Sequence, residues 1–400
     1  MREFRAEWSL FRSRRMGQAF LLVLLLVVVY QSMVQRAWVD TGEYLRKAQS
    51  MFDGWLPVSG DRMLEQSRRT PAFGLWLMLL GPLYTLVSGL ACLLFVLNLR
   101  IWVRRLSSYQ HAADWATLFV MLHPLTWVYA VVPMPELWCM ILFLGWLRGI
   151  SASNGRSLSI HSAVLLALKP VFVLLVPFGL LAVFWLPGFK NGLKSALWVV
   201  LGPLLVYSAT WLYHAHTMGV GHYSSVGISN ALEYNLPAYQ DGFRYQEVES
   251  DPAQTLAQSQ RIIRTTLVQQ ALPAALVHLR GLGVGLLDPG RYDLWAFWGA
   301  TGDMGIMKAL NQRRWPPGAT VAGLIYLCIG LAVNAAFLLV IMQGWLSQKR
   351  YRQHVFFALL CLCWLGIVGP VASARYTLIL YPLFSLWFAE GWLHRFSSRG

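Results

Sequence analysis

Long apolar segments recur along the whole chain and constrain its fold more than any other feature. A helix that crosses about 30 Å of hydrocarbon needs about 20 apolar residues, and inside a bilayer only helices and closed barrels satisfy every backbone polar group. Eight segments approach or exceed this length, namely 17–34, 72–98, 113–131, 136–150, 193–213, 319–342, 353–370 and 374–391. We therefore predict an all-α, polytopic transmembrane helical bundle.

Composition and charge agree with a membrane protein. The chain is 56% apolar and 13% charged, whereas soluble domains carry about 25% charged residues. The net charge of +15 would also suit a nucleic-acid-binding protein, but the basic residues flank apolar segments instead of gathering in one domain. We therefore expect a lipid bilayer, and not nucleic acid, as partner. All five cysteines lie inside apolar stretches, so no disulfide framework is predicted.

A further apolar segment, 158–187, is interrupted by Lys169-Pro170 and decides the topology. One continuous helix would be about 45 Å long, too long to stand upright, whereas two short helices would cross twice. Lys and Arg accumulate in cytoplasmic loops. With two crossings, the cytoplasmic tails and loops hold 17 Lys and Arg against 4 acidic residues, and the outer loops hold 16 against 14. Two crossings are favoured, which gives about ten spans with both termini in the cytoplasm.

Two long loops then face the outer side. The first covers residues 35–71, and the second contains a helical pattern at 252–272 and a partly apolar stretch at 273–287 that suits the membrane interface. Neither loop contains a glycine-rich phosphate-binding motif. The expected organisation is a transmembrane core (1–213), an extracytoplasmic loop domain (214–318) and C-terminal transmembrane helices (319–400).

Two outer regions carry carboxylates close to the membrane. Asp40 follows the first span by a few residues, where it can meet both a lipid-borne group and a water-borne hydroxyl. Asp40 and Glu43 also have capping-box spacing, and a helix cap and a general base are compatible roles. Glu136 opens the span 136–150, a position that the helix dipole favours whatever its use.

Basic residues are expected on the same face. Lys169 stands in apolar sequence, where an ionisable group usually faces a partner or a polar cavity, or else extends to the interface. Arg375-Tyr376 opens the last span; arginine suits bidentate phosphate contact, and an interfacial anchor is the alternative. Arg68-Arg69 precede the second span. Carboxylates and cations together suit a lipid phosphate leaving group and an acceptor that loses a proton.

Metal binding is the other chemistry that we considered. His214, His216 and His222 lie close in sequence, but a His-x-His pattern without a third ligand at fixed geometry is weak support for zinc. We predict no metal site and no cofactor.

The order of these motifs resembles the GT-C glycosyltransferases, in particular the bacterial branch similar to aminoarabinose transferases and protein O-mannosyltransferases. The likeness covers the first 190 residues well and the last span moderately, and it does not extend to the 214–318 loop. The motifs are Asp40 with Tyr44, Arg69-Thr70-Pro71, His123-Pro124 with Tyr129, Glu136, Lys169-Pro170 and Arg375-Tyr376.

The resemblance implies an enzyme that moves a sugar from a polyprenyl-phosphate-linked donor to a lipid, glycan or protein acceptor. It places the protein in a bacterial inner membrane, with the active site facing the periplasm. By analogy Asp40 is the general base, and Glu136 shapes or supports the site. Several relatives have a second acid directly after the first aspartate, whereas here Thr41 occupies that position and Glu43, three places after Asp40, is the further catalytic candidate. The expected substrate-binding residues are Tyr44, Arg68, Arg69, Lys169, Arg375 and Tyr376.

Two other function classes fit the same residues. A transporter or flippase of a lipid-linked or anionic solute would use the basic residues as a binding site. Such a fold often has inverted repeats with broken helices in matching halves, and the sequence shows one break, at Lys169-Pro170. A non-catalytic scaffold that presents the 214–318 loop to a partner is the third class.

Overall fold

The described part of the chain is helical. The computed structural model describes residues 2–34, 39–52, 64, 67–107, 109, 111–189, 191–240, 243, 251–287, 321–347, 351–368 and 374–397. Within these ranges the secondary structure consists of helices and turns, and no strand occurs. The predicted all-α class is confirmed for this part of the chain.

Several helices are long and apolar enough to cross a membrane. Within the described ranges four meet this criterion singly, and six do if each of two bent helix pairs is one span. The four are α2 (Arg15–Val34), the segment Pro71–Leu106 that contains α5 (Pro71–Leu80) and α6 (Tyr84–Leu106), α12 (Gly192–Met218), and Cys328–Leu346 within α19 (Val321–Leu346). These helices support an integral membrane protein.

The two bent pairs turn sharply at short breaks. Helices α8 (Pro124–Val131) and α9 (Glu136–Ser151) meet at 107°. Helices α15 (Pro252–Gln269) and α16 (Ala271–Leu287) meet at 94°. The bend before Glu136 places the first turn of α9, and with it this carboxylate, inside the protein.

The remaining apolar helices are each shorter than the four single spans. They are α7 (Ala112–Leu122), α10 (Gly155–Leu168), α11 (Leu175–Trp185), α20 (Tyr351–Val368), α21 (Ala374–Leu378) and α22 (Tyr381–Ser397). The prediction of one continuous helix over 113–131 is wrong, because Pro124 ends α7 and opens α8. The segment 374–391 is also interrupted, since Pro382 cannot donate a hydrogen bond to the carbonyl group of Leu378.

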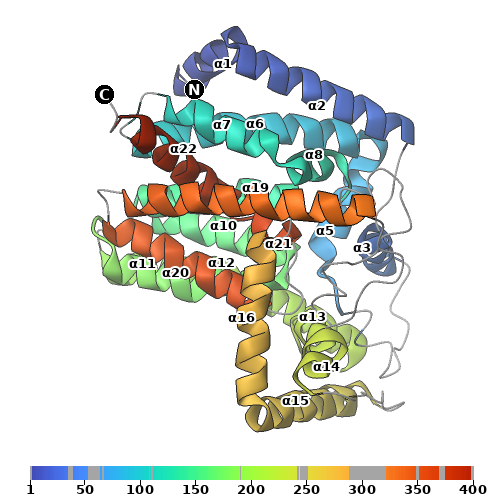
Figure 1. Cartoon of the computed structure of the whole chain (residues 1–400). Coiled ribbons are helices and arrows are strands. Elements are labelled where there is room, and N and C mark those ends of the chain that lie inside the picture. Colours follow the sequence, from blue (N-terminus) through green and yellow to red (C-terminus); the bar gives the residue numbers. More distant parts are fainter. Residues whose placement is uncertain are drawn as a thin grey trace.

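The break at Lys169-Pro170 lies where the sequence places it. Helix α10 ends at Leu168, and a 3-10 turn over Pro170–Leu174 leads into α11. Lys169 is extended, with φ −145° and ψ 125°, because the residue before a proline avoids the helical region. Both α10 and α11 pack against α12, and the three lie side by side in Figure 1.

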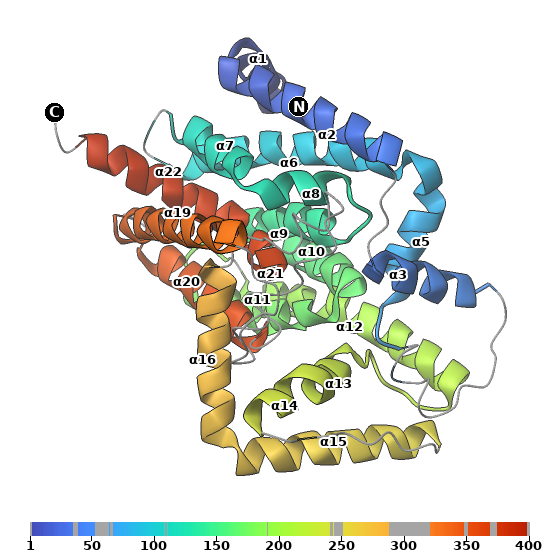
Figure 2. The same cartoon turned by 45° about the vertical axis from the view of Figure 1, so that its right-hand side comes forward.

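The apolar helices form a bundle of roughly parallel rods (Figure 1). Helices α1 (Arg2–Ser13) and the end of α22 lie at one end of it, and α3 (Val39–Ser50) lies at the other. We call these the α1 end and the α3 end. Helices α13 (Val226–Asn230), α14 (Leu236–Tyr239) and α15 lie together outside the bundle in both views (Figures 1 and 2).

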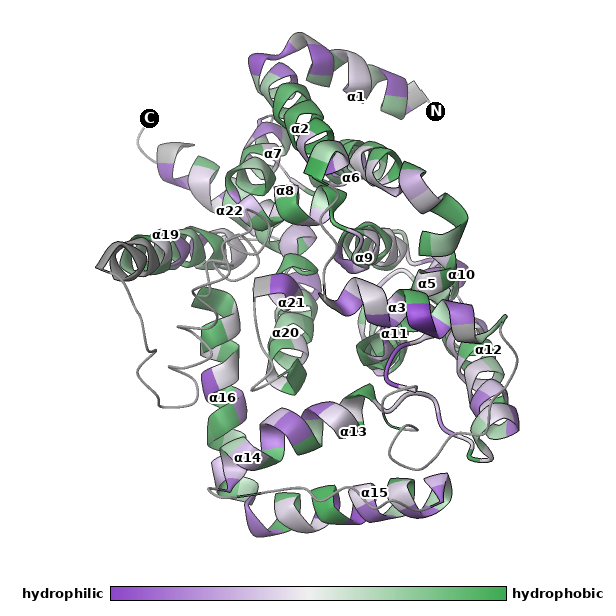
Figure 3. Cartoon of the chain, turned by 90° about the vertical axis from the view of Figure 1, so that its right-hand side faces the viewer, coloured by the Kyte–Doolittle hydropathy of each residue, from purple (hydrophilic) through white to green (hydrophobic). Residues whose placement is uncertain are grey.

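Helices of the bundle differ in hydropathy from α3 and α15. Figure 3 shows that α2 and α20 are mostly hydrophobic, whereas α3 and α15 have many hydrophilic positions. Helix α16 packs against α20 and α21. This part of the 214–318 segment therefore contacts the C-terminal helices directly.

A buried charge network closes the α1 end. Arg100 is 1% exposed and donates from Nη2 to Asp114 Oδ1 at 2.9 Å, while its Nε contacts Glu7. Arg104 also contacts Glu7, at 2.9 Å. The sequence places Arg100 in a cytoplasmic loop, but α6 continues to Leu106 and brings this arginine into the core. These ion pairs attach α1 to α6.

Candidate functional site

Asp40 lies at the α3 end, between two arginines. Its Oδ1 accepts a hydrogen bond from Arg69 Nη2 at 3.0 Å, and its Oδ2 accepts one from Arg375 Nη1 at 3.0 Å. Burial alone would raise the pKa of this carboxyl, but Arg375 and Arg69 outweigh burial and hold the pKa below its ordinary value. Asp40 is therefore an anion at neutral pH, with both oxygens engaged.

The sequence allowed for Asp40 as a helix cap, and the structure shows a different position. Helix α3 begins at Val39, so Asp40 is inside the first turn and does not occupy the N-cap. Residues three and four apart lie on one face of a helix, and Glu43 and Tyr44 therefore share a face with Asp40. The neighbouring Thr41 donates its hydroxyl to the carbonyl oxygen of Pro133 at 3.0 Å, which fixes α3 against the turn before α9.

Arg69 contacts all three residues on this face of α3. In addition to Asp40, its Nε donates to Glu43 Oε2 at 2.8 Å, and its guanidinium lies 5.1 Å from the centre of the Tyr44 ring. Burial alone would lower the pKa of Arg69, but Tyr44, Asp40 and Glu43 raise it further above its ordinary value. The next residue, Thr70, donates its hydroxyl to the carbonyl oxygen of Leu168 at 3.1 Å. The turn before α5 thus joins α3 to the end of α10.

A second ion pair lies deeper in the protein. Lys169 Nζ donates to Glu136 Oε1 at 2.6 Å; Glu136 is fully buried and Lys169 is 9% exposed. The alternative in which the lysine extends to the interface is therefore wrong. Tyr376 lies between the Lys169–Glu136 pair and the Arg375–Asp40 pair. Its ring centre is 5.3 Å from Lys169 Nζ and 5.3 Å from Arg375 Cζ.

The structure thus brings residues from distant parts of the sequence into one group, which we call the charge cluster. Its members are Asp40, Glu43, Arg69, Glu136, Lys169 and Arg375. Three carboxylates face three cations, so the formal charge is balanced. Each cation contacts a carboxylate, and an incoming anion has to compete for it.

Not every predicted site residue joins the charge cluster. Arg68 turns away and contacts Glu233 at 2.8 Å. Tyr44 is 2% exposed and packs edge-on against Phe73, with ring centres 4.9 Å apart. Its contribution to the site is the aromatic face beneath the Arg69 guanidinium.

Glu136 Oε2 differs from the carboxylate oxygens that form the ion pairs of the charge cluster. Among the described residues, no hydrogen bond reaches Glu136 Oε2, although the atom is buried. Buried polar atoms are usually paired. The first-turn position in α9 stabilises the anion through the helix dipole, and Oε2 retains its capacity to accept a hydrogen bond.

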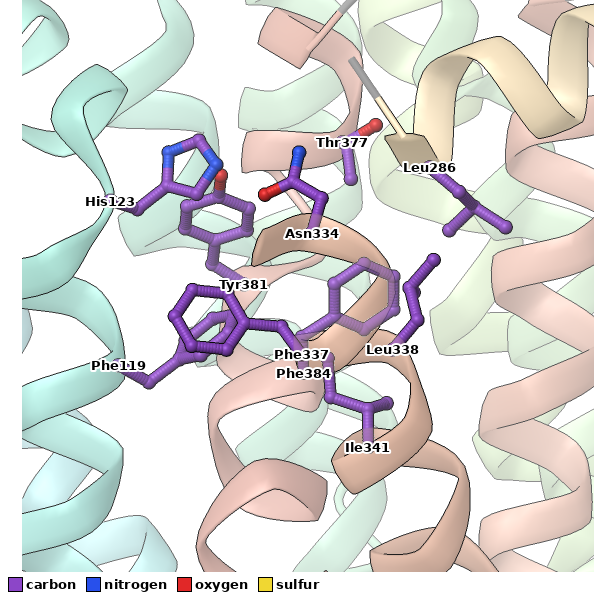
Figure 4. Close-up of a pocket in the computed structure, with 10 residues that line it drawn as sticks. All are labelled: Phe119, His123, Leu286, Asn334, Phe337, Leu338, Ile341, Thr377, Tyr381 and Phe384. Carbon is purple, nitrogen blue, oxygen red and sulfur yellow. The ribbon is translucent and has the colours of Figure 1, made fainter. Parts of the chain in front are cut away.

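A small cavity lies within the bundle (Figure 4). Thr377 and Tyr381, which follow Arg375 in sequence, line it together with His123 and Asn334. Within the described ranges, His123 Nδ1 is buried without a hydrogen-bond partner, and the His123 ring lies edge-on to Tyr381 with centres 4.6 Å apart. The cavity volume is about 30 Å³, which suits a water molecule and not a sugar.

A second group of polar residues adjoins α3, and the sequence did not single out its lysine. Lys47 Nζ lies 3.4 Å from His214 Nε2 and 5.0 Å from the centre of the Tyr213 ring. The rings of His214 and His222 stack with centres 4.5 Å apart. Among the described residues, no three potential metal ligands come together. Lys47 could have been noticed from its spacing, since it lies one turn after Glu43.

Lys47 provides a prediction about stability and pH. Burial lowers the pKa of Lys47 from 10.5 to about 8. Between these values the unfolded chain binds the proton that the folded protein has released, so stability is expected to rise as pH increases from 8 to 10.5. Below pH 8 the buried ammonium is destabilising, so Lys47→Met should raise the melting temperature at pH 7 and flatten its dependence on pH.

Thermal unfolding in detergent between pH 7 and 10 measures both effects. Arg46→Met is the matched control, because Arg46 is the adjacent but exposed cation on α3. A lower melting temperature for Lys47→Met at pH 7 would show that the ammonium stabilises the fold, contrary to this expectation.

In comparisons with known proteins, no family model, no curated protein and no solved structure matches the chain. The function proposed below rests on the sequence and on the geometry of the charge cluster.

Proposed function

We propose that the protein is a membrane glycosyltransferase of the GT-C type, which moves a sugar from a polyprenyl-phosphate donor to an acceptor hydroxyl. The observation that carries the proposal is the position of Asp40 between Arg69 and Arg375, beside the Lys169–Glu136 pair. A potential base and three cations lie together at one end of a membrane bundle. They suit a reaction in which the base takes the proton of an acceptor hydroxyl while a lipid phosphate leaves.

The proposed topology has about ten spans, with both termini in the cytoplasm of a bacterial cell and the charge cluster at the periplasmic face of the inner membrane. The excess of Lys and Arg in the tails and loops assigned to the cytoplasm supports this orientation. Contacts between side chains also support it, since Tyr109 meets His394 at 3.4 Å and Arg105 meets Glu3, all in segments assigned to the cytoplasm.

In the free protein Asp40 is a weak base, because two guanidinium groups stabilise its anion. A donor phosphate carries oxygens that match the same groups in bidentate geometry. When the phosphate binds Arg69 and Arg375, Asp40 loses those hydrogen bonds and becomes more basic. Donor binding therefore prepares the base before the acceptor is activated.

The proposed reaction is a single displacement at the anomeric carbon. Asp40 takes the proton of the acceptor hydroxyl while the acceptor oxygen bonds to the anomeric carbon. The bond from that carbon to the phosphate oxygen breaks, and its electron pair leaves with the polyprenyl phosphate. Arg69, Arg375 and Lys169 stabilise the phosphate charge that develops, and Glu136 holds Lys169 in place.

Binding of a polyprenyl monophosphate tests the donor site. The purified protein should melt at a higher temperature with this lipid than with the matching polyprenol, which lacks the phosphate. Arg375→Ala should abolish the difference, whereas Arg68→Ala should retain most of it because Arg68 lies outside the charge cluster. Equal stabilisation by the phosphate and the alcohol would contradict a phosphate site.

The topology yields a separate prediction. Gln254 on α15 and Arg12 on α1 are both exposed and are assigned to opposite sides of the membrane. In a protein whose five cysteines have been replaced, a cysteine at 254 should react with a membrane-impermeant maleimide in right-side-out vesicles. A cysteine at 12 should react only after the vesicles are opened. Labelling of both positions in sealed vesicles would contradict the proposed number of crossings.

A further inference from the structure

A larger cavity lies apart from the charge cluster, between the end of α12, the start of α13 and α15. Its volume is about 680 Å³, within the usual range for small-molecule sites. We call it the α12–α15 pocket. Its lining includes Tyr207, His222, Tyr223, Ile263, Arg264 and Leu267.

One wall of the pocket is apolar and partly open. Leu256, Ile263 and Leu267 lie on one face of α15, and Tyr207 stacks on Tyr223 with ring centres 5.1 Å apart. Leu267 is 40% exposed and the adjacent lining residue Val268 is 74% exposed. An aliphatic surface of this kind fits a hydrocarbon chain.

The same helix also supplies a charged group. Among the described residues, Arg264 is the one ionised side chain that lines the pocket, and α15 contains no acidic residue. An anion can therefore bind Arg264 without competing against a carboxylate within the pocket. This differs from the charge cluster, where each cation is paired.

His222 contributes an uncharged ring to the lining of the pocket. It is 92% buried, and its Nδ1 lies 3.3 Å from the carbonyl oxygen of Val220. A carbonyl oxygen can only accept, so Nδ1 carries the proton. Burial also lowers the pKa of His222, which keeps the ring neutral and leaves Arg264 as the charged contact for a ligand.

We propose that the α12–α15 pocket binds an anionic membrane phospholipid. The aliphatic surface takes an acyl chain, and Arg264 pairs with the phosphate. The proposal does not depend on sugar transfer. The pocket is nevertheless joined to the charge cluster, since Ser224 donates to the carbonyl oxygen of Arg68 at 3.0 Å, next to Arg69.

Native mass spectrometry of the detergent-purified protein tests the proposal with three probes. Phosphatidylglycerol carries a net negative charge, phosphatidylcholine has the same phosphate but offsets it with its own cation, and glycerol phosphate has the phosphate without chains. We expect one phosphatidylglycerol to remain bound at concentrations where the other two do not. Retention of glycerol phosphate alone would replace the lipid by a soluble phosphate and overturn the proposal, as would equal retention of both lipids.

Two substitutions locate the site. Arg264→Ala should weaken phosphatidylglycerol binding about 10-fold to 100-fold, the effect of losing a charged hydrogen bond. Arg261→Ala is the matched control, because it removes a similar exposed cation from α15 that does not line the pocket. Equal weakening by both variants would indicate general electrostatic attraction and contradict a specific site.

Filling the pocket provides a test that leaves every charge in place. Gly227 lines the pocket, and a Cβ atom added there meets no atom within 4 Å. Gly227→Leu should therefore abolish retention of phosphatidylglycerol without lowering the melting temperature. Undiminished binding in the folded variant would show that the lipid binds elsewhere.

Discussion

Replacing Asp40 with asparagine is expected to lower the rate of sugar transfer by about 100-fold to 10,000-fold, the usual contribution of a general base. Asparagine has nearly the same shape but takes up no proton. The same variant should bind polyprenyl phosphate at least as tightly as the original protein, because the carboxylate no longer competes for Arg69 and Arg375. Loss of transfer together with retained donor binding separates a missing base from a misfolded protein.

Glu43→Gln is the matched control for this experiment. Glu43 also contacts Arg69, but it makes no contact with Arg375 in the described structure. Its replacement should lower transfer much less than Asp40→Asn. Transfer is measured with a radiolabelled polyprenyl-phosphate sugar and a bacterial envelope extract as acceptor. Near-normal transfer by Asp40→Asn would remove Asp40 as the base, and a flippase that binds the same lipid would show no transfer in any variant.

The largest effect on stability is expected from Lys169→Met. Glu136 is fully buried and Lys169 Nζ is its ion-pair partner at 2.6 Å, so removal of the lysine leaves a buried carboxylate without this cation. Breaking a buried ion pair on one side typically costs about 3–5 kcal/mol. The free energy of unfolding, measured by denaturant titration in mixed micelles, should fall by about this amount.

A double variant distinguishes the ion pair from general packing. Lys169→Met combined with Glu136→Gln removes both charges and should recover much of the lost stability, since replacing a whole buried pair costs little. Both variants that lack Lys169 should bind polyprenyl phosphate more weakly. If the double variant is as unstable as the sum of the single variants, the two side chains contribute independently and the ion pair does not organise the site.

Much of the fold could be predicted because the bilayer imposes simple rules. The length of an apolar segment follows from the hydrocarbon thickness, and α2, α12 and α19 lie close to the predicted boundaries. The break at Lys169 was predictable because proline excludes the preceding residue from helical backbone. The break at His123-Pro124 carries the same signal, but the apolar residues on both sides masked it.

The charge network at the α1 end was not predictable in the same way. Arg100 follows an apolar segment and has the position of a loop cation, yet α6 extends past it. Its partners, Glu7 and Asp114, come from an N-terminal helix and from α7. Only the packing of these helices brings the three residues together.

In the candidate site, too, some features follow from the sequence and others only from the tertiary structure. Topology places Asp40, Lys169 and Arg375 at one end of the bundle, and the structure brings their side chains together. The ion pairs between these cations and the carboxylates were harder to predict. The sequence presents the cations as unoccupied phosphate ligands, whereas each already contacts a carboxylate. Arg68 and Arg69 are adjacent in sequence, and only the direction of each side chain separates Glu233 from Asp40 as a partner.

A structure of the protein with polyprenyl monophosphate bound tests the central claim most directly. We predict phosphate oxygens within hydrogen-bonding distance of the Arg69 and Arg375 guanidinium groups, with the Asp40 carboxylate released from at least one of them. A lipid phosphate bound away from these arginines, with Asp40 still held by both, would contradict the proposed donor site and the role of Asp40 as the base.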